Sequence, residues 1–216
     1  MTATVLADPA AAVLYDISPR LTPSLAVWPG DPPLARKVLM RLEAGDEATV
    51  SSFSASAHLG AHADAPSHFG IGAPSIDEVD VGIYLGPCEL FRVNVPRGGL
   101  VRPEALPGPP RAPRVLIATG THPDPEVFRE DFAALSPELI RFLAARGVKL
   151  VGIDTPSVDP FESTAHPAHL ACLESNVAIL EGLRLDGVPE GVYELIALPL
   201  RLAGFDGSPV RAVLRS

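Results

Sequence analysis

Cysteine, tryptophan and lysine are scarce in this chain of 216 residues, and basic residues are outnumbered by acidic ones. Cys88 and Cys172 are the only cysteines, which excludes a disulfide framework and favours a reducing compartment. The formal net charge is -9, and this argues against a nucleic-acid partner and against an anionic membrane surface, because both select a basic face. No apolar run approaches the roughly 18 residues of a membrane span, and the N-terminus does not resemble a signal peptide. We therefore expect a cytoplasmic protein.

Hydrophobic residues make up 47% of the chain, enough for a sizeable core. The clearest pattern is an apolar strand at 114–119, a helix at 137–146 and a second strand at 148–153. Ser136 is a suitable N-cap and Pro137 suits the first helical position, so this order predicts a βαβ unit with parallel strands. A shorter helix is expected between 165 and 174. Further strands are expected at 13–17, 49–57, 88–95, 177–180, 195–198 and 209–214. The fold class is therefore α/β, a single layered domain with a mixed sheet.

A histidine cluster carries the strongest chemical signal. The segment HLGAHADAPSH, residues 58–68, contains three of the six histidines and one aspartate: His58, His62, Asp64 and His68. Imidazole and carboxylate are the ligands of zinc and similar divalent ions. Gly60 and Pro66 argue against a helix here, so we expect an extended segment in which these four residues, all of even number, share one face. The interpretation is a metal or catalytic site with an open position, rather than a closed structural site, which usually uses cysteine.

Further candidates lie elsewhere in the chain. His166, His169 and Glu181 could add ligands, since an acid at the end of a buried strand is costly unless it is paired. His122, in a Pro-rich loop, is expected at the surface. Trp28 is the single tryptophan and sits in turn-like sequence, so that both a core role and a ligand-binding role stay open.

Several motifs together resemble one known family. HLGAHADAPSH resembles the HxGTHxDxPxH signature of the cyclase-like metal-dependent hydrolases, with Ala61 in place of the usual Thr. Segments beginning at Tyr15 (YDIS…VWPGD), Val148 (VKLVGIDTPSVDP) and Ile179 (ILEGL) resemble further family motifs. Within the family the resemblance is strongest to the bacterial kynurenine formamidases (arylformamidases). It implies a cyclase-like, swivelling β/α/β domain over residues 13–216, preceded by a flexible N-terminal extension at 1–12.

The resemblance also implies roles for individual residues. It makes His68 the catalytic proton donor and acceptor and assigns Trp28 to substrate binding. It selects His169 over His166, and it implies that Asp64 and Glu181 each bridge two ions. The implied metal ligands are His58, His62, Asp64, His169 and Glu181, holding two Zn²⁺ ions per chain, with Mn²⁺ or another divalent ion as alternatives.

The implied reaction is metal-dependent hydrolysis of N-formyl-L-kynurenine to L-kynurenine and formate, as a step of tryptophan degradation. The expected partners are this small-molecule substrate and further copies of the chain, in a homodimer or higher homo-oligomer. Two alternatives stay open: a related hydrolase acting on isatin or another cyclic amide, and a metal-binding relative without catalysis.

Overall fold

Nine strands form one mixed sheet in the part of the chain that the computed structural model describes, residues 12–216. The strand order is β1-β13-β11-β5-β7-β9-β10-β4-β12. The strands are β1 (Leu14–Asp16), β4 (His62–Asp64), β5 (Leu85–Arg92), β7 (Arg114–Ala118), β9 (Leu150–Ile153), β10 (Ala178–Glu181), β11 (Gly191–Ile196), β12 (Gly207–Pro209) and β13 (Val213–Arg215). The expectation of an extension at 1–12 falls almost wholly outside the described residues.

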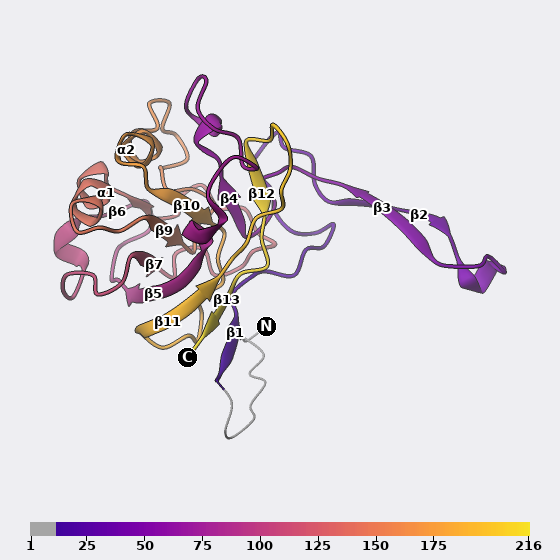
Figure 1. Cartoon of the computed structure of the whole chain (residues 1–216), viewed down its shortest axis with the longest axis horizontal. Helices are drawn as coiled ribbons and strands as arrows, with labels where there is room; N and C mark the ends of the chain where they lie inside the picture. Colours follow the sequence, from indigo (N-terminus) through magenta and orange to yellow (C-terminus); the bar gives the residue numbers. More distant parts are fainter. Residues whose placement is uncertain (1–11) are drawn as a thin grey trace.

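The sheet curls until its two ends approach each other. Strand β12 is at one end of the strand order and β13 is the second strand from the other end, yet only residues 210–212 join them. A chain spans at most about 3.3–3.6 Å per residue, so the two ends of the sheet must be close together. Backbone hydrogen bonds support this arrangement: Val210 N donates to Ala61 O at 2.9 Å and Ile17 N to Ala212 O at 3.0 Å. Figure 1 shows the curled sheet with both α-helices on its outer side.

The predicted βαβ unit is confirmed. Helix α1 (Pro137–Ala144) connects β7 to β9, and these two strands pair in parallel. Its first turn is capped as expected, because the Ser136 hydroxyl accepts a hydrogen bond from Leu139 N at 3.1 Å. The second predicted helix is α2 (Pro167–Ser175).

Apolar side chains fill both faces of the sheet. Alternate strand residues such as Leu90, Leu116 and Leu180 pack inside the curl, where Tyr84 and Ile17 are also buried. Their neighbours on the opposite face pack against the buried stripes of α1 and α2. Both faces of the curled sheet are therefore covered by apolar packing.

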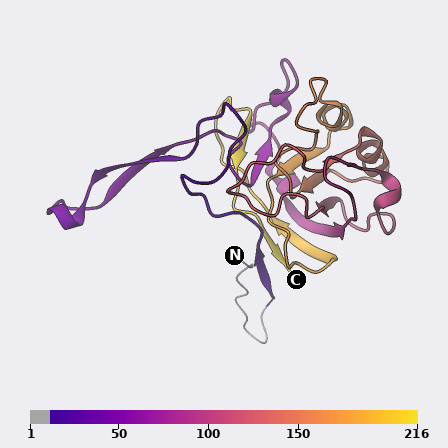
Figure 2. The same cartoon turned by 180° about the vertical axis from the view of Figure 1, so that it is seen from behind.

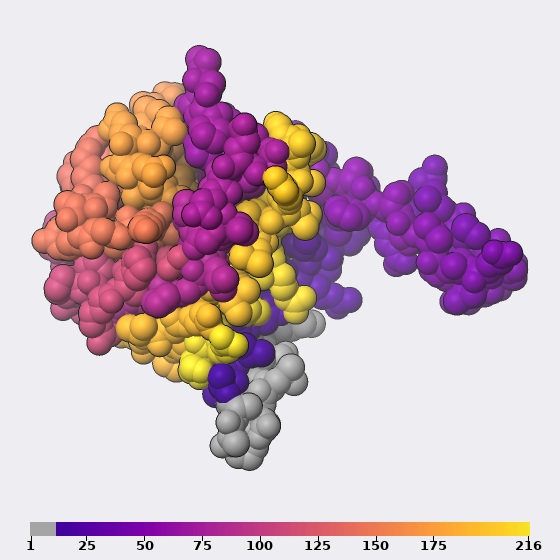
Figure 3. All heavy atoms as spheres, in the orientation of Figure 1, coloured from indigo at the N-terminus to yellow at the C-terminus, as the bar shows by residue number. Residues whose placement is uncertain are grey.

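A long hairpin leaves the body of the molecule. It consists of β2 (Ala35–Met40) and β3 (Val50–Ser54), which pair antiparallel, and we call residues 35–54 the arm. Figures 1 and 2 show the arm extending away from the curled sheet, and Figure 3 shows it as a separate projection. The remaining elements are β6 (Leu100–Val101) paired with β8 (Ala134–Leu135), and the 3₁₀ helices η1 (Leu42–Ala44), η2 (Pro66–His68), η3 (Val81–Tyr84) and η4 (Pro103–Ala105).

Three sequence expectations differ from the structure. The strand expected at 209–214 is two strands, because the chain crosses from one end of the sheet to the other at 210–212. The segment 58–68 is extended only at β4, and η2 follows because Pro66 starts a tight turn. Strand β2 was not expected, because it has no buried face to produce an alternating pattern. Both cysteines are buried and free. None of the helices described at 12–216 is long and apolar enough to cross a membrane.

Candidate metal centre and adjoining cavity

Strand pairing brings together acidic and imidazole side chains that lie far apart in the sequence. Strand β4 lies between β10 and β12, and in its antiparallel register with β10 His62 is opposite Glu181. His62 and Asp64 lie two residues apart, so they share one face of β4 and point to the same side as Glu181. His169 joins them from the first turn of α2. All four side chains are at least 95% buried.

The four buried side chains contact one another through their ligand atoms. His62 Nε2 lies 3.4 Å from Asp64 Oδ1 and 3.3 Å from Glu181 Oε2. His169 Nε2 lies 3.4 Å from Asp64 Oδ2 and 3.3 Å from Glu181 Oε1. These separations exceed the roughly 2.7–2.9 Å of a good charge-assisted hydrogen bond. Asp64 Oδ2 is buried and accepts no hydrogen bond within the described chain.

The electrostatics of the cluster favour positive charge at its centre. Burial alone would lower the pKa of His62, but the carboxylates of Asp64 and Glu181 raise it to about 10. The same carboxylates and Asp159 raise the pKa of His169 well above its usual value, against the effect of burial. Conversely, the neighbouring imidazoles hold the pKa of Asp64 well below its usual range, although burial opposes this. The two carboxylates thus stay ionised and attract a cation.

Neighbouring groups hold both buried imidazoles in fixed orientations. His62 Nδ1 lies 2.9 Å from Gly60 O, which leaves Nε2 to face the carboxylates. His169 Nδ1 lies 2.7 Å from Asp159 Oδ2, and the Asp159 carboxylate also accepts the backbone N–H groups of Ala168 and His169 at the start of α2. Such a carboxylate–histidine pair orients a metal-binding imidazole and raises its basicity. The sequence alone did not indicate this role of Asp159.

Two further histidines border the buried cluster and are only half-buried. His58 Nδ1 lies 3.0 Å from Asp64 Oδ1, and its ring stacks on His68 with 4.1 Å between centroids. Asp206 joins this pair, since its Oδ2 lies 3.2 Å from His58 Nε2 and 3.3 Å from His68 Nδ1. Burial lowers the pKa of His68, so its imidazole is neutral near pH 7 and can accept a proton. Asp206 was also missed, because a single aspartate in a turn carries no spacing signal.

A close backbone contact holds the cluster in register. Gly182 follows Glu181 with a φ of 64°, and a Cβ at this position would lie 2.2 Å from Gly60 O. Only glycine allows β10 to approach the 60–61 backbone this closely. Glu181 Oε1 also accepts a hydrogen bond from Val158 N at 2.6 Å. The positions of Glu181 and His62 are therefore fixed by backbone geometry.

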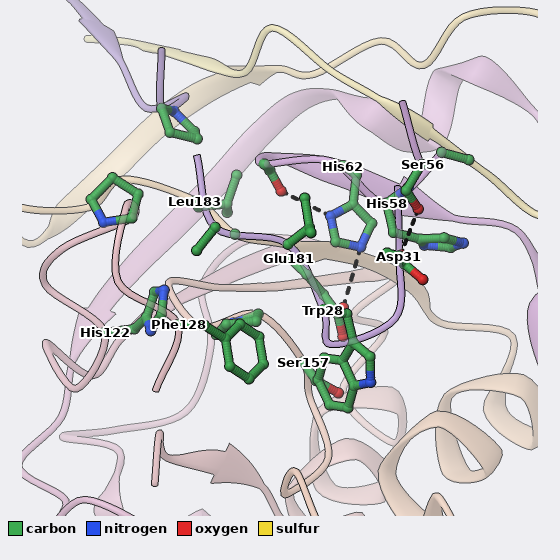
Figure 4. A pocket seen from close by; sticks show the side chains of 18 of the residues that line it. Trp28, Asp31, Ser56, His58, His62, His122, Phe128, Ser157, Glu181 and Leu183 are labelled. Atoms are coloured by element: carbon green, nitrogen blue, oxygen red, sulfur yellow. Dashed lines mark hydrogen bonds and ion pairs between the residues drawn. The ribbon is translucent and has the colours of Figure 1, made fainter. Parts of the chain in front are cut away.

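A cavity of about 580 Å³ opens beside the cluster. His58, His62, His68, His169 and Glu181 lie on its wall, as Figure 4 shows for the three of them that it labels. Another part of the wall is aromatic. Trp28 lines the cavity and packs edge-to-face on Phe128 with centroids 5.6 Å apart, and it contacts Phe161 at 5.0 Å. The structure thus places Trp28 next to the histidine cluster and not in the core.

The structure also places the two remaining histidines, His122 and His166. His122 is half-buried and lines the cavity, so the expectation of a surface residue is wrong. The cause is tertiary: Asp154, after β9, accepts hydrogen bonds from the backbone of Thr119 and Gly120 and folds their loop inward. His166 begins α2 in the left-handed region (φ 44°), and its ring centroid is 6.1 Å from that of His169.

The donor set fits a divalent metal ion. Three groups of ligand atoms lie within 4.8 Å of one another: His62 with Asp64 and Glu181; His58 with Asp64 and His68; and Asp159 with His166 and His169. The first two share Asp64, which has the buried oxygen without a partner. Imidazole and carboxylate ligands suit zinc and its first-row neighbours. The residues predicted as ligands therefore meet in one place and could hold metal.

Comparison with solved structures supports the fold. The chain is 28% identical to a protein described as a potential metal-dependent hydrolase with cyclase activity, over 95% of this chain and 98% of that one, with a TM-score of 0.79. It is 27% identical to a predicted metal-dependent hydrolase from Bacillus stearothermophilus, over 95% and 99%, with a TM-score of 0.80. Isatin hydrolase A from Labrenzia aggregata, at 24% identity over 94% and 93% and a TM-score of 0.78, shares the fold.

A family model covers the first part of this fold, including β4 and the loop that carries Asp159. The model is described as putative cyclase, and it matches residues 15–160. Since this is more than half of the sequence, the chain belongs to the cyclase family.

Proposed function

We propose that this protein is a metal-dependent amide hydrolase that converts N-formyl-L-kynurenine and water to L-kynurenine and formate. One observation carries the proposal: a buried cluster of two imidazoles and two carboxylates borders a cavity that its His62, His169 and Glu181 line together with Trp28 and Phe128. The likeness to proteins described as metal-dependent hydrolases supports the reaction class.

We assign His58, His62, Asp64, His169 and Glu181 as the metal ligands. Asp64 faces His62 with one carboxylate oxygen and His169 with the other, and Glu181 does the same. Two carboxylates with histidines on both sides suit a pair of ions, for which we propose Zn²⁺, with Mn²⁺ as the alternative. A divalent ion held here supplies Lewis acidity, which polarises a carbonyl oxygen and makes water acidic enough to attack near neutral pH.

The other side chains of the cavity would handle protons and hold the aryl ring. Neutral His68, held by Asp206, accepts a proton from the attacking water and delivers it to the departing aniline nitrogen. This delivery matters because an anilide anion is a poor leaving group. Trp28 offers a flat apolar surface on which the aryl ring can stack. The bond that breaks is the formyl C–N bond, and the water oxygen ends in formate.

The test is turnover of N-formyl-L-kynurenine, followed by the absorbance of the product, with metal content measured on the same sample. We expect activity to disappear with chelator and to return when zinc or manganese is added. His68→Ala should retain metal and lose turnover by about 10²–10⁴-fold, the usual contribution of a general acid or base. Asp64→Ala should lose metal and activity together.

Other outcomes would redirect the proposal. Full activity and full metal content in Asp64→Ala would show that the site is wrongly placed. A protein that holds metal but cleaves only isatin would keep the site and change the substrate to a cyclic amide. A protein that holds metal and cleaves neither compound would be a non-catalytic relative.

We also propose that the chain forms a homodimer through the arm. Two-stranded hairpins are marginally stable alone, yet every residue of β3 is exposed. One face of the arm carries Val38 and Phe53, and Phe53 is 72% exposed, while Met40 and Val50 lie on the other face. Basic Arg36 and Lys37 lie at the stem, and acidic Glu43 and Glu47 at the tip. If the arms of two copies packed antiparallel, the face that carries Phe53 in one arm would contact the same face of the other. The basic stem of each arm would then meet the acidic tip of its partner.

The remaining assignments are the domain and the compartment. We propose that residues 13–216 act as one cyclase-like domain, and that the protein works in the cytoplasm, where its two buried free cysteines stay reduced.

A further inference from the structure

The cavity has a second polar end, away from the metal cluster. Figure 4 shows His122 at one side of the pocket and His58 at the other, with Phe128 and Trp28 between them. Arg184, three residues after Glu181, lines the cavity together with His122. The mechanism proposed above uses neither residue.

This end of the cavity carries the guanidinium of Arg184, in a protein whose net charge is -9. The Arg184 side chain is 19% exposed, pairs with Asp186, and donates from its guanidinium to His122 O at 3.4 Å. A guanidinium has five N–H donors, so these contacts leave donors for a ligand. The His122 ring makes no hydrogen bond within the described chain, and its Nδ1 is buried without a partner. Burial is the largest effect that lowers the pKa of His122, and the nearby cations, first among them Arg184, lower it further.

The arrangement is preformed. Asp154 lines the same cavity, but its oxygens accept hydrogen bonds from Thr119 N, Thr119 Oγ1 and Gly120 N at 2.7–3.0 Å. This carboxylate is therefore occupied in fixing the loop that carries His122. Contacts with Asp186 and with the backbone carbonyl of His122 likewise hold the Arg184 guanidinium in place.

We propose that His122 and Arg184 form a subsite for a carboxylate of the substrate. An aromatic section separates this subsite from the metal cluster, so the preferred substrates are aryl amides with an anionic tail rather than neutral aryl amides. The inference rests on the proposed function, since it names the substrate class of the same cavity. Bidentate recognition by arginine suits a carboxylate in particular.

The test measures binding and does not depend on turnover. Because Trp28 is the only tryptophan and lines the cavity, its fluorescence reports ligand binding. Three probes are titrated into the metal-loaded protein: L-kynurenine, its deaminated analogue that keeps the carboxylate, and neutral 2-aminoacetophenone. The variants are Arg184→Gln and His122→Asn, and the control is Arg129→Gln, which removes an exposed charge close to His122 that does not line the cavity.

We expect the wild type to bind both carboxylates more tightly than the neutral ketone. Arg184→Gln should weaken both carboxylates by about tenfold or more, as for the loss of a hydrogen bond to a charged group, and leave the ketone unchanged. His122→Asn should act in the same direction, and Arg129→Gln should change nothing. Equal weakening of all three probes, or no weakening of any, would overturn the subsite. Selective binding of carboxylates by a protein that does not hydrolyse N-formyl-L-kynurenine would instead keep the subsite and reject the proposed reaction.

Discussion

At the scale of single residues, His166 and His169 offer a direct test of the metal ligands. His169 contacts Asp64 and Glu181, whereas His166 starts the helix three residues earlier in a left-handed conformation that asparagine also tolerates. We expect His169→Asn to lower metal affinity by more than the roughly 10–100-fold typical of an outer partner. His166→Asn should keep wild-type affinity. Metal content after dialysis checks both, and equal losses would contradict the assignment.

Asp159 allows a second test, which asks whether the residue that orients the ligand His169 contributes to metal affinity. Its carboxylate orients His169 and accepts the first backbone N–H groups of α2. Asp159→Asn removes the charge from this pair, so metal affinity should fall about 10–100-fold while the protein stays folded. A chelator competition titration measures this. Asp80→Asn is the matched control, since Asp80 also caps a helix, η3, but lies outside the cavity lining. An unchanged affinity in Asp159→Asn would mean that the pair does not tune the site.

Local sequence predicted the individual ligands better than their arrangement. The cluster His58, His62 and Asp64 is readable because the three residues lie within one short segment. Asp206 was not readable, because it meets His58 only after parts of the chain 148 residues apart pack together. Asp159 lies ten residues before His169, in a loop without a periodic pattern. The shared parity of residues 58–68 suggested one extended face, but η2 turns His68 back onto His58.

At the scale of elements, the contact between β10 and β4 depends on Gly182. Gly182→Ala places a methyl group 2.2 Å from Gly60 O, in addition to the cost of a left-handed backbone. Gly187→Ala is the matched control, with φ 71° and nothing within 4 Å. The control should lose about 1–2 kcal/mol of unfolding free energy, and Gly182→Ala at least about 2 kcal/mol more. Urea unfolding measures both, and equal losses would show that the close approach can relax.

The arm supplies a prediction about assembly. Phe53→Asp puts a charge on the face of the arm that carries Phe53 and Val38, and Ser52→Asp puts the same charge on the opposite face. We expect the wild type and Ser52→Asp to have the mass of a dimer in light scattering, and Phe53→Asp to shift to the monomer. A monomeric wild type, or a dimer in both variants, would remove the arm from the interface.

Elements with local signals were predicted, and elements defined by distant partners were not. Ser136, Pro137 and the apolar stripe of α1 lie in one short stretch, so its start was predictable. The crossing at residues 210–212 depends on which strands lie at the two ends of the sheet, and strand order leaves no local mark. Strand β2 was missed because its side chains lack a buried face.

At the scale of the whole molecule, the metal centre should contribute to stability. Asp64 and Glu181 are both buried. Burial and the charge of Asp64 oppose ionisation of Glu181, but hydrogen bonds from His169 and His62 still hold the pKa of Glu181 below its usual value. A bound ion offsets the repulsion between the two carboxylates, and at a hundred times its Kd it adds about 2.7 kcal/mol. Chelation should therefore lower Tm by roughly 5–10 °C for a protein of this size. Differential scanning calorimetry measures the shift, and the absence of any shift would argue against metal at the buried cluster.

The pairing of β4 with β10 also bears on the order of events during folding. His62 and Glu181 come together only when a long loop closes, and long-range pairings of this kind form slowly. A metal ion would then find its complete ligand set only in the nearly native protein. It should slow the rate of unfolding while leaving the rate of folding almost unchanged, in contrast to zinc fingers, whose folding depends on the metal. The ion would thus stabilise the folded protein against unfolding and would not be needed for folding itself.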